Sequence, residues 1–181
     1  MTRAQLEHLI RAAAVIADDD ELVIIGSQAV LGQFPQAPAA LLVSVEADLY
    51  PKNHPERADL IDGTIGELSP FHDTFGYYAQ GVGETTAVLP AGWQQRMVPI
   101  RNENTRHATG WCLEVHDLVL SKYVARRDKD IRFVREAIAH GLVDERVLRE
   151  RARSLPLLPD RIAHIAALID ADVRQAEAGH A

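Results

Sequence analysis

Apolar and polar residues follow one another along the first half of the chain in patterns that predict helices and strands in turn. Over residues 3–17 apolar side chains recur at helical spacing, which predicts an amphipathic helix. A short β-branched run at residues 21–26 predicts a buried strand that stops at Gly26. A second strand is predicted over residues 41–50, beyond a proline-marked loop. Two further helices are expected at residues 27–33 and 54–68.

The middle of the chain is rich in β-forming residues. Two short runs, 76–82 and 85–90, predict a hairpin, because the Gly-Glu pair between them suits a tight turn. Further strands are expected at residues 96–101 and 108–115.

The order of these elements predicts the fold class. From residue 116 onward the apolar spacing is helical and predicts three or four helices. We therefore expect a mixed α/β (α+β) core over residues 1–115, with a small sheet flanked by helices. A C-terminal helical layer over residues 116–181 is expected to pack on this core as one compact unit.

Composition excludes several classes of protein. Of the 181 residues 47% are hydrophobic and 25% are charged, which is typical of a globular domain. The single cysteine, Cys112, excludes a disulfide framework and a cysteine-rich zinc site. No apolar stretch is long enough for a membrane helix or a signal peptide, so we expect a cytoplasmic protein without a membrane partner. The histidines lack metal-binding spacing, and no Walker A, GxGxxG or GxSxG motif occurs.

Charge is distributed unevenly. The net charge of −7 argues against a large nucleic-acid interface. Residues 101–135, however, contain eight basic and five acidic residues, a local charge of +3. Such a segment fits a phosphate-bearing ligand, and it fits a solvated helix face equally well.

Two acids in the second predicted strand raise a question of electrostatics. Glu46 and Asp48 are two residues apart, so their side chains point to the same face of a strand. Like charges this close repel unless a cation lies between them, and Mg²⁺ prefers oxygen ligands together with substrate phosphates. Alternatively, the strand emerges into solvent here. Gly26 and Ser27 stand where a strand enters a helix, which is either a phosphate site or an ordinary helix cap.

A third candidate lies in the predicted helix that follows residue 116. Asp117, Ser121 and Lys122 fall near one another, and Lys122 lies beside an apolar stripe. A lysine in this position reaches either solvent or a phosphate. The charge-dense residues 126–130 are otherwise explained by local ion pairs.

Together these features resemble the nucleotidyltransferase superfamily with a polymerase-β-like core. The details look most like bacterial nucleotidyltransferase-like proteins allied to the AbiEii-type toxins of toxin–antitoxin systems. The resemblance covers most of residues 22–138. It is carried by the stretches "IIGSQAVLGQFPQAPAALLVSVEADLYP", "LPAGWQQRMVPI" and "GWCLEVHDLVLSKYVARRDKDIRFVREAI".

The resemblance implies roles for the first set of candidates. Gly26 and Ser27 match the turn that holds the phosphates of the nucleotide, and Glu46 and Asp48 match the metal-binding Asp-x-Asp. The implied activity is transfer of a nucleoside monophosphate from an NTP, with Mg²⁺ or Mn²⁺ as cofactor. The implied acceptor is an RNA, for example tRNA, and the implied protein partner is an antitoxin.

It also implies roles in the second half of the chain. Lys122 matches a lysine brought to the triphosphate, and Arg126 is a further nucleotide-binding candidate on the same helix. Asp130 matches an acid that follows this lysine, with a metal-linked, catalytic or structural role. Glu114 is the candidate for a third metal-binding carboxylate, with Asp73 behind it.

Two departures from the pattern of the superfamily support alternative hypotheses. The first carboxylate is Glu46, where Asp is usual, and Leu42 stands where relatives often have Arg. An extra methylene shifts a strictly octahedral Mg²⁺ site. A degenerate module of the same fold that only binds a nucleotide or a protein is therefore the second hypothesis. In the third, the core is merely structural and the apolar stripe of residues 162–169 forms an oligomer interface; the stripe fits packing back onto the core equally well.

Overall fold

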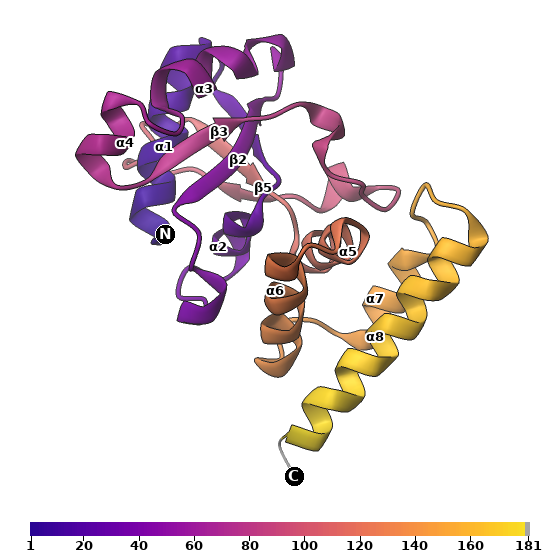
Figure 1. The fold of residues 1–181 in the computed structure, drawn as a ribbon. Coiled ribbons are helices and arrows are strands. Elements are labelled where there is room, and N and C mark those ends of the chain that lie inside the picture. The colour runs from indigo at the N-terminus through magenta and orange to yellow at the C-terminus, as the bar shows by residue number, and fades with distance from the viewer. Residues whose placement is uncertain (180–181) are drawn as a thin grey trace. The chain divides into compact units, whose positions relative to one another are not determined.

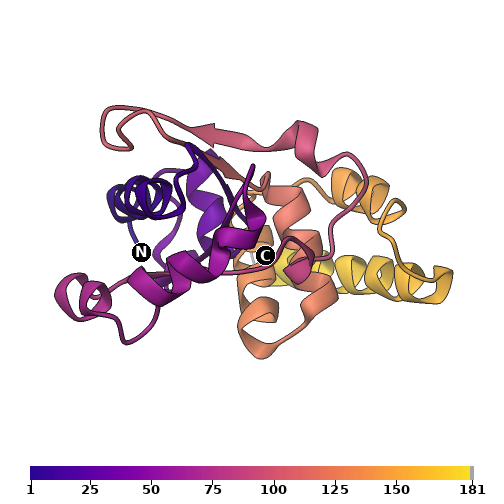
Figure 2. The same ribbon diagram turned by 90° about the horizontal axis from the view of Figure 1, so that it is seen from above.

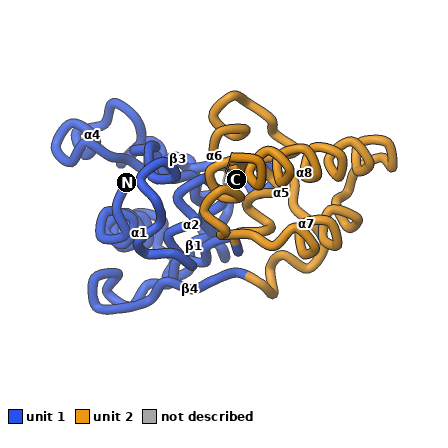
Figure 3. The backbone as a smooth tube through the Cα atoms, turned by 90° about the horizontal axis from the view of Figure 1, so that it is seen from below, with its two compact units in different colours: residues 1–86, 97–114 blue, residues 87–96, 115–181 orange. Residues whose placement is uncertain are grey.

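The computed structural model describes residues 1–179, which divide into two compact units (Figure 3). The first unit contains residues 1–86 and 97–114, and the second contains residues 87–96 and the chain from residue 115 onward. The stretch 87–96 thus groups with the C-terminal helices, although β strands precede and follow it in the sequence. No helix within residues 1–179 is both long and apolar enough to cross a membrane.

A five-stranded mixed sheet forms the centre of the first unit, in the order β3-β2-β1-β5-β4 (Figure 1). β1 pairs antiparallel with β2 and parallel with β5, β3 runs parallel to β2, and β4 runs antiparallel to β5. This sheet, with its flanking helices and the helices that follow it, confirms the predicted fold class. The strands are β1 (Glu21–Ile24), β2 (Glu46–Pro51), β3 (Tyr78–Gly81), β4 (Val98–Ile100) and β5 (Thr109–Cys112).

Four α-helices belong to the first unit. The first of them has the predicted bounds, and it starts at a capping box in which Thr2 and Gln5 exchange hydrogen bonds of 2.7 and 3.3 Å. The helices are α1 (Arg3–Ala17), α2 (Val30–Gln33), α3 (Ala58–Ile65) and α4 (Pro70–Phe75). Short 3₁₀ turns occur at Ser27–Ala29, Ala39–Leu41, Pro55–Arg57 and Glu84–Thr86.

The helices α1 and α3 cover one face of the sheet. A side chain added to Gly110 of β5 would meet Ile10 of α1, and one added to Gly81 of β3 would meet the backbone of α3. The strand register places both glycines on the same face as Leu49 of β2. Because side chains alternate along a strand, positions 46 and 48 point to the opposite face. The predicted acids therefore lie away from the face that α1 and α3 cover.

The predicted start of the second strand was wrong. β2 begins at Glu46, and the apolar residues before it lie outside the sheet. The Ser44 hydroxyl accepts a hydrogen bond from the Glu46 N–H at 3.1 Å, which forms a local turn in place of a strand ladder. Val43 and Val45 are accordingly 79% and 45% exposed. The two acids thus stand at the beginning of their strand.

The predicted hairpin was also wrong. β3 pairs in parallel with β2, and the residues that follow it form a 3₁₀ turn instead of a return strand. Before β3, the structure contains α4, which the apolar pattern did not predict. The sequence signals for this helix are its terminal residues. Ser69 accepts a hydrogen bond from the His72 N–H at 3.2 Å and Pro70 begins the helix. Gly76 ends it with φ +72°.

The second unit is helical, as predicted. It contains a 3₁₀ turn at Trp93–Arg96 and α5 (Val115–Ala125), α6 (Asp128–Ala139), α7 (Glu145–Ala152) and α8 (Pro159–Gly179). α8 contacts both α6 and α7 (Figures 1 and 2). Ile165 and Ile169, from the stripe proposed as an oligomer interface, are 2% and 0% exposed, so their apolar surface is already covered.

Candidate functional site

The glycine at the end of β1 and the second acid of β2 lie against each other. Because β2 runs antiparallel to β1, its first residues lie beside the end of β1, and the Ile25 N–H donates to the Asp48 carbonyl at 3.0 Å. A side chain on Gly26 would lie 2.8 Å from Cγ of Asp48 and 3.0 Å from its Cβ. The φ of Gly26 is −78°, so lack of space is what requires glycine here. The structure thus brings together two predicted features, Gly26-Ser27 and the acidic strand.

The two acids share the face that their spacing predicts. Glu46 and Asp48 are both half-buried, whereas Ala47 between them is fully buried on the other face. Tyr78, opposite Glu46 in β3, donates its hydroxyl to Oε2 of Glu46 at 3.2 Å. Burial, followed by the charge of Glu46, raises the pKa of Tyr78 to about 12. The phenol therefore stays protonated at neutral pH and holds the Glu46 carboxylate as a neutral donor.

The turn that follows Gly26 differs from the predicted helix. Ser27 was expected to be an N-cap, but Gly26 occupies that position without a side-chain hydrogen bond, and Ser27 is the first residue of the 3₁₀ turn. α2 is only four residues long, so a phosphate bound here would depend on nearby N–H groups more than on a helix dipole.

Gln28, next in this turn, was not singled out by the sequence. It is fully buried, and neither of its amide atoms has a hydrogen-bond partner within residues 1–179.

Glu114 follows β5 at the same end of the sheet at which Gly26 follows β1. The Leu113 N–H donates to the Ile24 carbonyl at 3.1 Å, which extends the β1–β5 pairing to the residue before Glu114. Asp73, the reserve candidate, is exposed on α4. No group of three or more His, Cys, Asp or Glu side chains within residues 1–179 is arranged to hold a metal. Two carboxylates can still bind Mg²⁺ when substrate phosphates and water complete its shell, and Glu114 stays a predicted third ligand.

In the second unit, Lys122 is held by an acid. Its Nζ lies 3.1 Å from Oδ1 of Asp130, and the side chains are 9% and 1% exposed. Arg127 Nε donates to Oδ2 of Asp130 at 2.7 Å, and the Arg127 N–H donates to the same atom at 3.2 Å. The ammonium also lies 5.9 Å from the centre of the Phe133 ring. The structure thus brings Lys122 and Asp130 together, and the Arg127–Asp130 contact is one of the local ion pairs expected within residues 126–130.

These contacts determine what Asp130 can do. Burial alone would raise the pKa of Asp130, but the Arg127 hydrogen bond and the Lys122 charge outweigh it, so the pKa lies below its usual value. A carboxylate with a lowered pKa and two cationic partners is a poor general base. Of the metal-linked, catalytic and structural roles considered for Asp130, its contacts favour the structural one, in which it positions Lys122.

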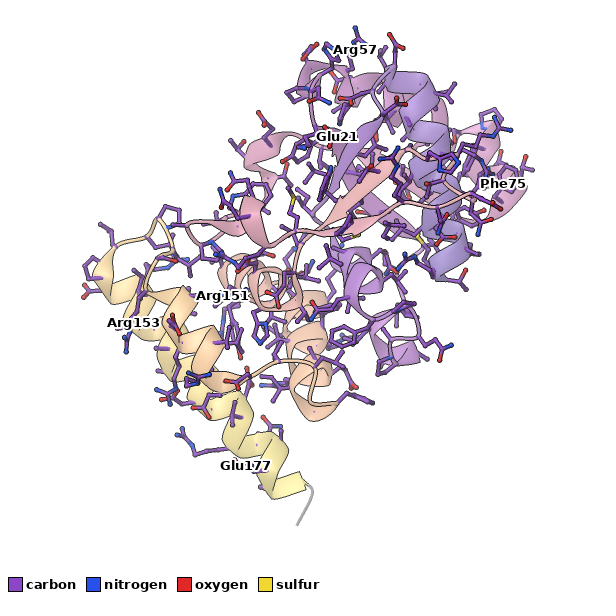
Figure 4. All side chains as sticks on the ribbon, turned by 180° about the vertical axis from the view of Figure 1, so that it is seen from behind. Glu21, Arg57, Phe75, Arg151, Arg153 and Glu177 are labelled. Carbon is purple, nitrogen blue, oxygen red and sulfur yellow. The ribbon has the colours of Figure 1, made fainter. Side chains whose placement is uncertain are left out.

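The sequence singled out Asp117 of α5 only as a neighbour of Ser121 and Lys122, without a role of its own. The Asp117 side chain is 0% exposed and accepts hydrogen bonds from Arg96 Nε at 2.8 Å and Nη2 at 3.1 Å. Arg151 of α7 (Figure 4) donates to the same carboxylate at 3.0 Å. Asp117 therefore links the 87–96 segment, α5 and α7. The arginines are 21 and 34 residues away in the sequence, so no local pattern could have revealed the cluster.

Comparison with known proteins gives one family match. A family model described as "Nucleotidyltransferase of unknown function (DUF6036)" matches residues 4–161, which cover nearly all of the first unit and part of the second. No curated protein and no solved structure matches the chain significantly.

Proposed function

The chain belongs to this family of nucleotidyltransferases of unknown function, and on that basis we propose that it transfers a nucleoside monophosphate from an NTP in a metal-dependent reaction. In this reaction an acceptor hydroxyl oxygen forms a bond to the α-phosphorus and loses its proton to solvent. The bond from the α-phosphorus to the β-phosphate oxygen breaks, and pyrophosphate leaves.

The observation that carries the proposal is the contact between Gly26 and Asp48. A side chain at position 26 would collide with the Asp48 carboxylate, so glycine lets the backbone of the turn lie directly against this carboxylate. Glu46, two residues before Asp48, points to the same face of the sheet. A phosphate-binding turn beside two carboxylates is the arrangement that a metal-bound triphosphate requires.

Each residue of the first unit has a distinct role in the proposal. Glu46 and Asp48 hold Mg²⁺ or Mn²⁺, and Tyr78 orients the Glu46 carboxylate without neutralising its charge. The Gly26 backbone and the Ser27 hydroxyl bind phosphate oxygens. When bound, the metal ion would offset negative charge on the phosphates and lower the pKa of the acceptor hydroxyl.

The acceptor and the biological setting rest on the resemblance to AbiEii-type proteins. We propose an RNA end, such as that of tRNA, as acceptor, and a toxin–antitoxin system with an antitoxin partner as the setting. Lys122 and Arg126 are the proposed phosphate-binding cations of the second unit, and the buried pair with Asp130 supports a fixed orientation for Lys122.

The test is transfer of labelled phosphate from each of the four α-labelled NTPs to total RNA, with Mg²⁺, with Mn²⁺ and with EDTA. We expect metal-dependent incorporation of label into RNA. The rate of incorporation should be at least about a hundredfold lower in Asp48→Asn. Asp59→Asn is the matched control, because Asp59 is exposed on α3 and outside the candidate site. Thermal melting of each variant separates loss of chemistry from loss of folding.

A negative result has a defined meaning. If no NTP labels RNA or protein, and Asp48→Asn leaves metal-dependent NTP binding unchanged, the transferase proposal is wrong. The alternative, a module of the same fold that binds without catalysis, then takes its place.

A further inference from the structure

A cavity of about 130 Å³ lies within the second unit, between α5, α6 and α8. Its inner wall includes Tyr123 and Val134, which are buried, whereas Arg126 and Gln175 at its rim are exposed. The other lining residues are Lys122, Ile131, Arg135, Leu168, Ala171 and Asp172.

The polar wall of the cavity is pre-organised. Asp172 accepts a hydrogen bond from the Tyr123 hydroxyl at 3.2 Å and one from Arg135 Nε at 3.0 Å. Burial, and then the charge of Asp172, raise the pKa of Tyr123 well above its ordinary value. The phenol therefore stays protonated, and the Asp172 carboxylate lies in a fixed orientation beside the apolar wall.

Arg126 supplies positive charge at the rim. It ends α5 with φ +54°, a left-handed conformation that is uncommon for a residue with a side chain, and its N–H donates to the Lys122 carbonyl at 2.9 Å. Its guanidinium makes no hydrogen bond and no ion pair with the described part of the chain, residues 1–179. Of the three cationic residues in the lining, Lys122 is paired with Asp130 and Arg135 with Asp172, so Arg126 is the cation that can attract an anion.

Size and chemistry narrow the choice of ligand. An apolar cavity of about 150 Å³ holds benzene, so a cavity of about 130 Å³ has room for one six-membered ring but is too small for the two fused rings of a purine. Val134 and Leu168 offer an apolar surface to such a ring, while Gln175 and Asp172 offer hydrogen-bonding groups to its edge. The Arg126 guanidinium matches a phosphate outside the cavity.

We propose that this cavity binds a pyrimidine nucleotide, with the ring inside and the phosphate at Arg126. The inference rests on the proposed function for the choice of a nucleotide over other anions. The nucleotide is either a free NTP or the terminal nucleotide of an RNA acceptor, because both offer the same ring and phosphate.

Calorimetric titration of the full chain with UMP, CMP, AMP and GMP in EDTA tests the proposal. We expect the pyrimidine nucleotides to bind at least about tenfold more tightly than the purine nucleotides, because only the single ring fits. Arg126→Ala removes a charged hydrogen bond and should weaken UMP binding about ten- to a hundredfold. Arg132→Ala is the matched control, since Arg132 is exposed on α6 and does not line the cavity.

A second variant tests the cavity itself. Ala171→Phe places a ring in the lining and should abolish UMP binding, whereas Ala167→Phe, one turn earlier in α8 and outside the lining, should leave it unchanged. Parallel titrations with UTP and with a short RNA that ends in uridine show whether the cavity binds a free NTP or the end of an RNA. The natural ligand is expected to be the one that binds more tightly.

The outcomes separate this inference from the proposed function. Metal-free UMP binding that persists in Asp48→Asn and is lost in Ala171→Phe supports the cavity, even in a chain that transfers nothing. Nucleotide binding that needs Mg²⁺ and is lost in Asp48→Asn but kept in Arg126→Ala overturns the cavity assignment and leaves the transferase proposal standing. Equal binding of all four nucleotides, or none in EDTA, also overturns it.

Discussion

Removing the charge of Asp130 should destabilise the second unit strongly. Asp130 is 1% exposed and lies 3.1 Å from the ammonium of Lys122, whose side chain is 9% exposed. At this distance two unit charges attract by about 5 kcal/mol at an effective dielectric constant of 20. Asp130→Asn keeps the shape of the side chain but leaves the Lys122 ammonium buried without its counter-charge.

The expected loss of stability is about 3–5 kcal/mol, the usual cost of leaving one charge of a buried pair uncompensated. Arg127 contributes little to this figure, since its side chain is 60% exposed and water screens its charge. A protein of this size is stabilised by only about 5–15 kcal/mol, so the effect should be plain. In urea unfolding monitored by circular dichroism, Asp130→Asn should have a lower midpoint urea concentration. The slope of the unfolding free energy against urea concentration should be unchanged.

Two further variants isolate the cause. Asp128→Asn is the matched control, because Asp128 is exposed at the start of the same helix and should change stability by less than about 0.5 kcal/mol. Lys122→Met combined with Asp130→Leu removes both charges and should recover much of the loss. A loss below about 1 kcal/mol in Asp130→Asn, the value of an exposed pair, would refute the reasoning.

The same pair predicts a dependence on pH. The pKa of Asp130 is lower in the folded protein than its unfolded value of about 3.9, so its contribution is fully present above that pH. The contribution is lost as the pH falls towards the lower folded value. The stability gap between the native chain and Asp130→Asn should therefore be constant from about pH 5 to 7 and shrink below about pH 4.

Three predictions concern the first unit. Gly26→Ala should displace the Asp48 carboxylate and reduce nucleotide transfer at least about tenfold, measured with α-labelled NTPs, because the added carbon would lie 3.0 Å or less from Asp48. Tyr78→Phe frees Glu46 from its donor and should weaken Mg²⁺-dependent NTP binding several-fold in a thermal-shift titration; unchanged binding would remove Tyr78 from the site. Gln28→Met removes a buried amide without partners and should raise unfolding stability by about 1–3 kcal/mol in urea. A fall in stability would indicate that a buried water satisfies Gln28.

Elements with a strong local signal were predicted well from the sequence. α1 has its predicted bounds because its apolar period and its capping box act within the same few residues. The strand before Gly26 and the C-terminal helices, expected to be three or four and found to be four within residues 1–179, were predicted for similar reasons. β2 and β3 were predicted less well because their limits depend on partners. A side-chain turn at Ser44 delays β2, and β3 pairs with β2 instead of folding back into a hairpin.

The candidate site shows the same division. The common face of Glu46 and Asp48 follows from their spacing alone, whereas the contact of Asp48 with Gly26 depends on the antiparallel register of two strands. The sequence placed Asp117 near Lys122 but did not reveal its partners, because both arginines are distant in the sequence. An ion pair can be predicted from sequence only when its two residues are near neighbours in the chain, as Arg127 and Asp130 are.

The replacement of the usual Asp by Glu46 can be understood from the strand beside it. A longer side chain places the carboxylate farther from its own backbone, where the Tyr78 hydroxyl of β3 holds it at 3.2 Å. A tyrosine whose pKa is about 12 stays neutral and donates a hydrogen bond. It therefore orients the carboxylate but does not cancel the attraction of the carboxylate for a cation. An arginine at position 78 would have neutralised the acid instead. The hydrogen bond from Tyr78 is therefore compatible with the proposed metal-binding role of Glu46, because it orients the carboxylate and leaves its negative charge in place.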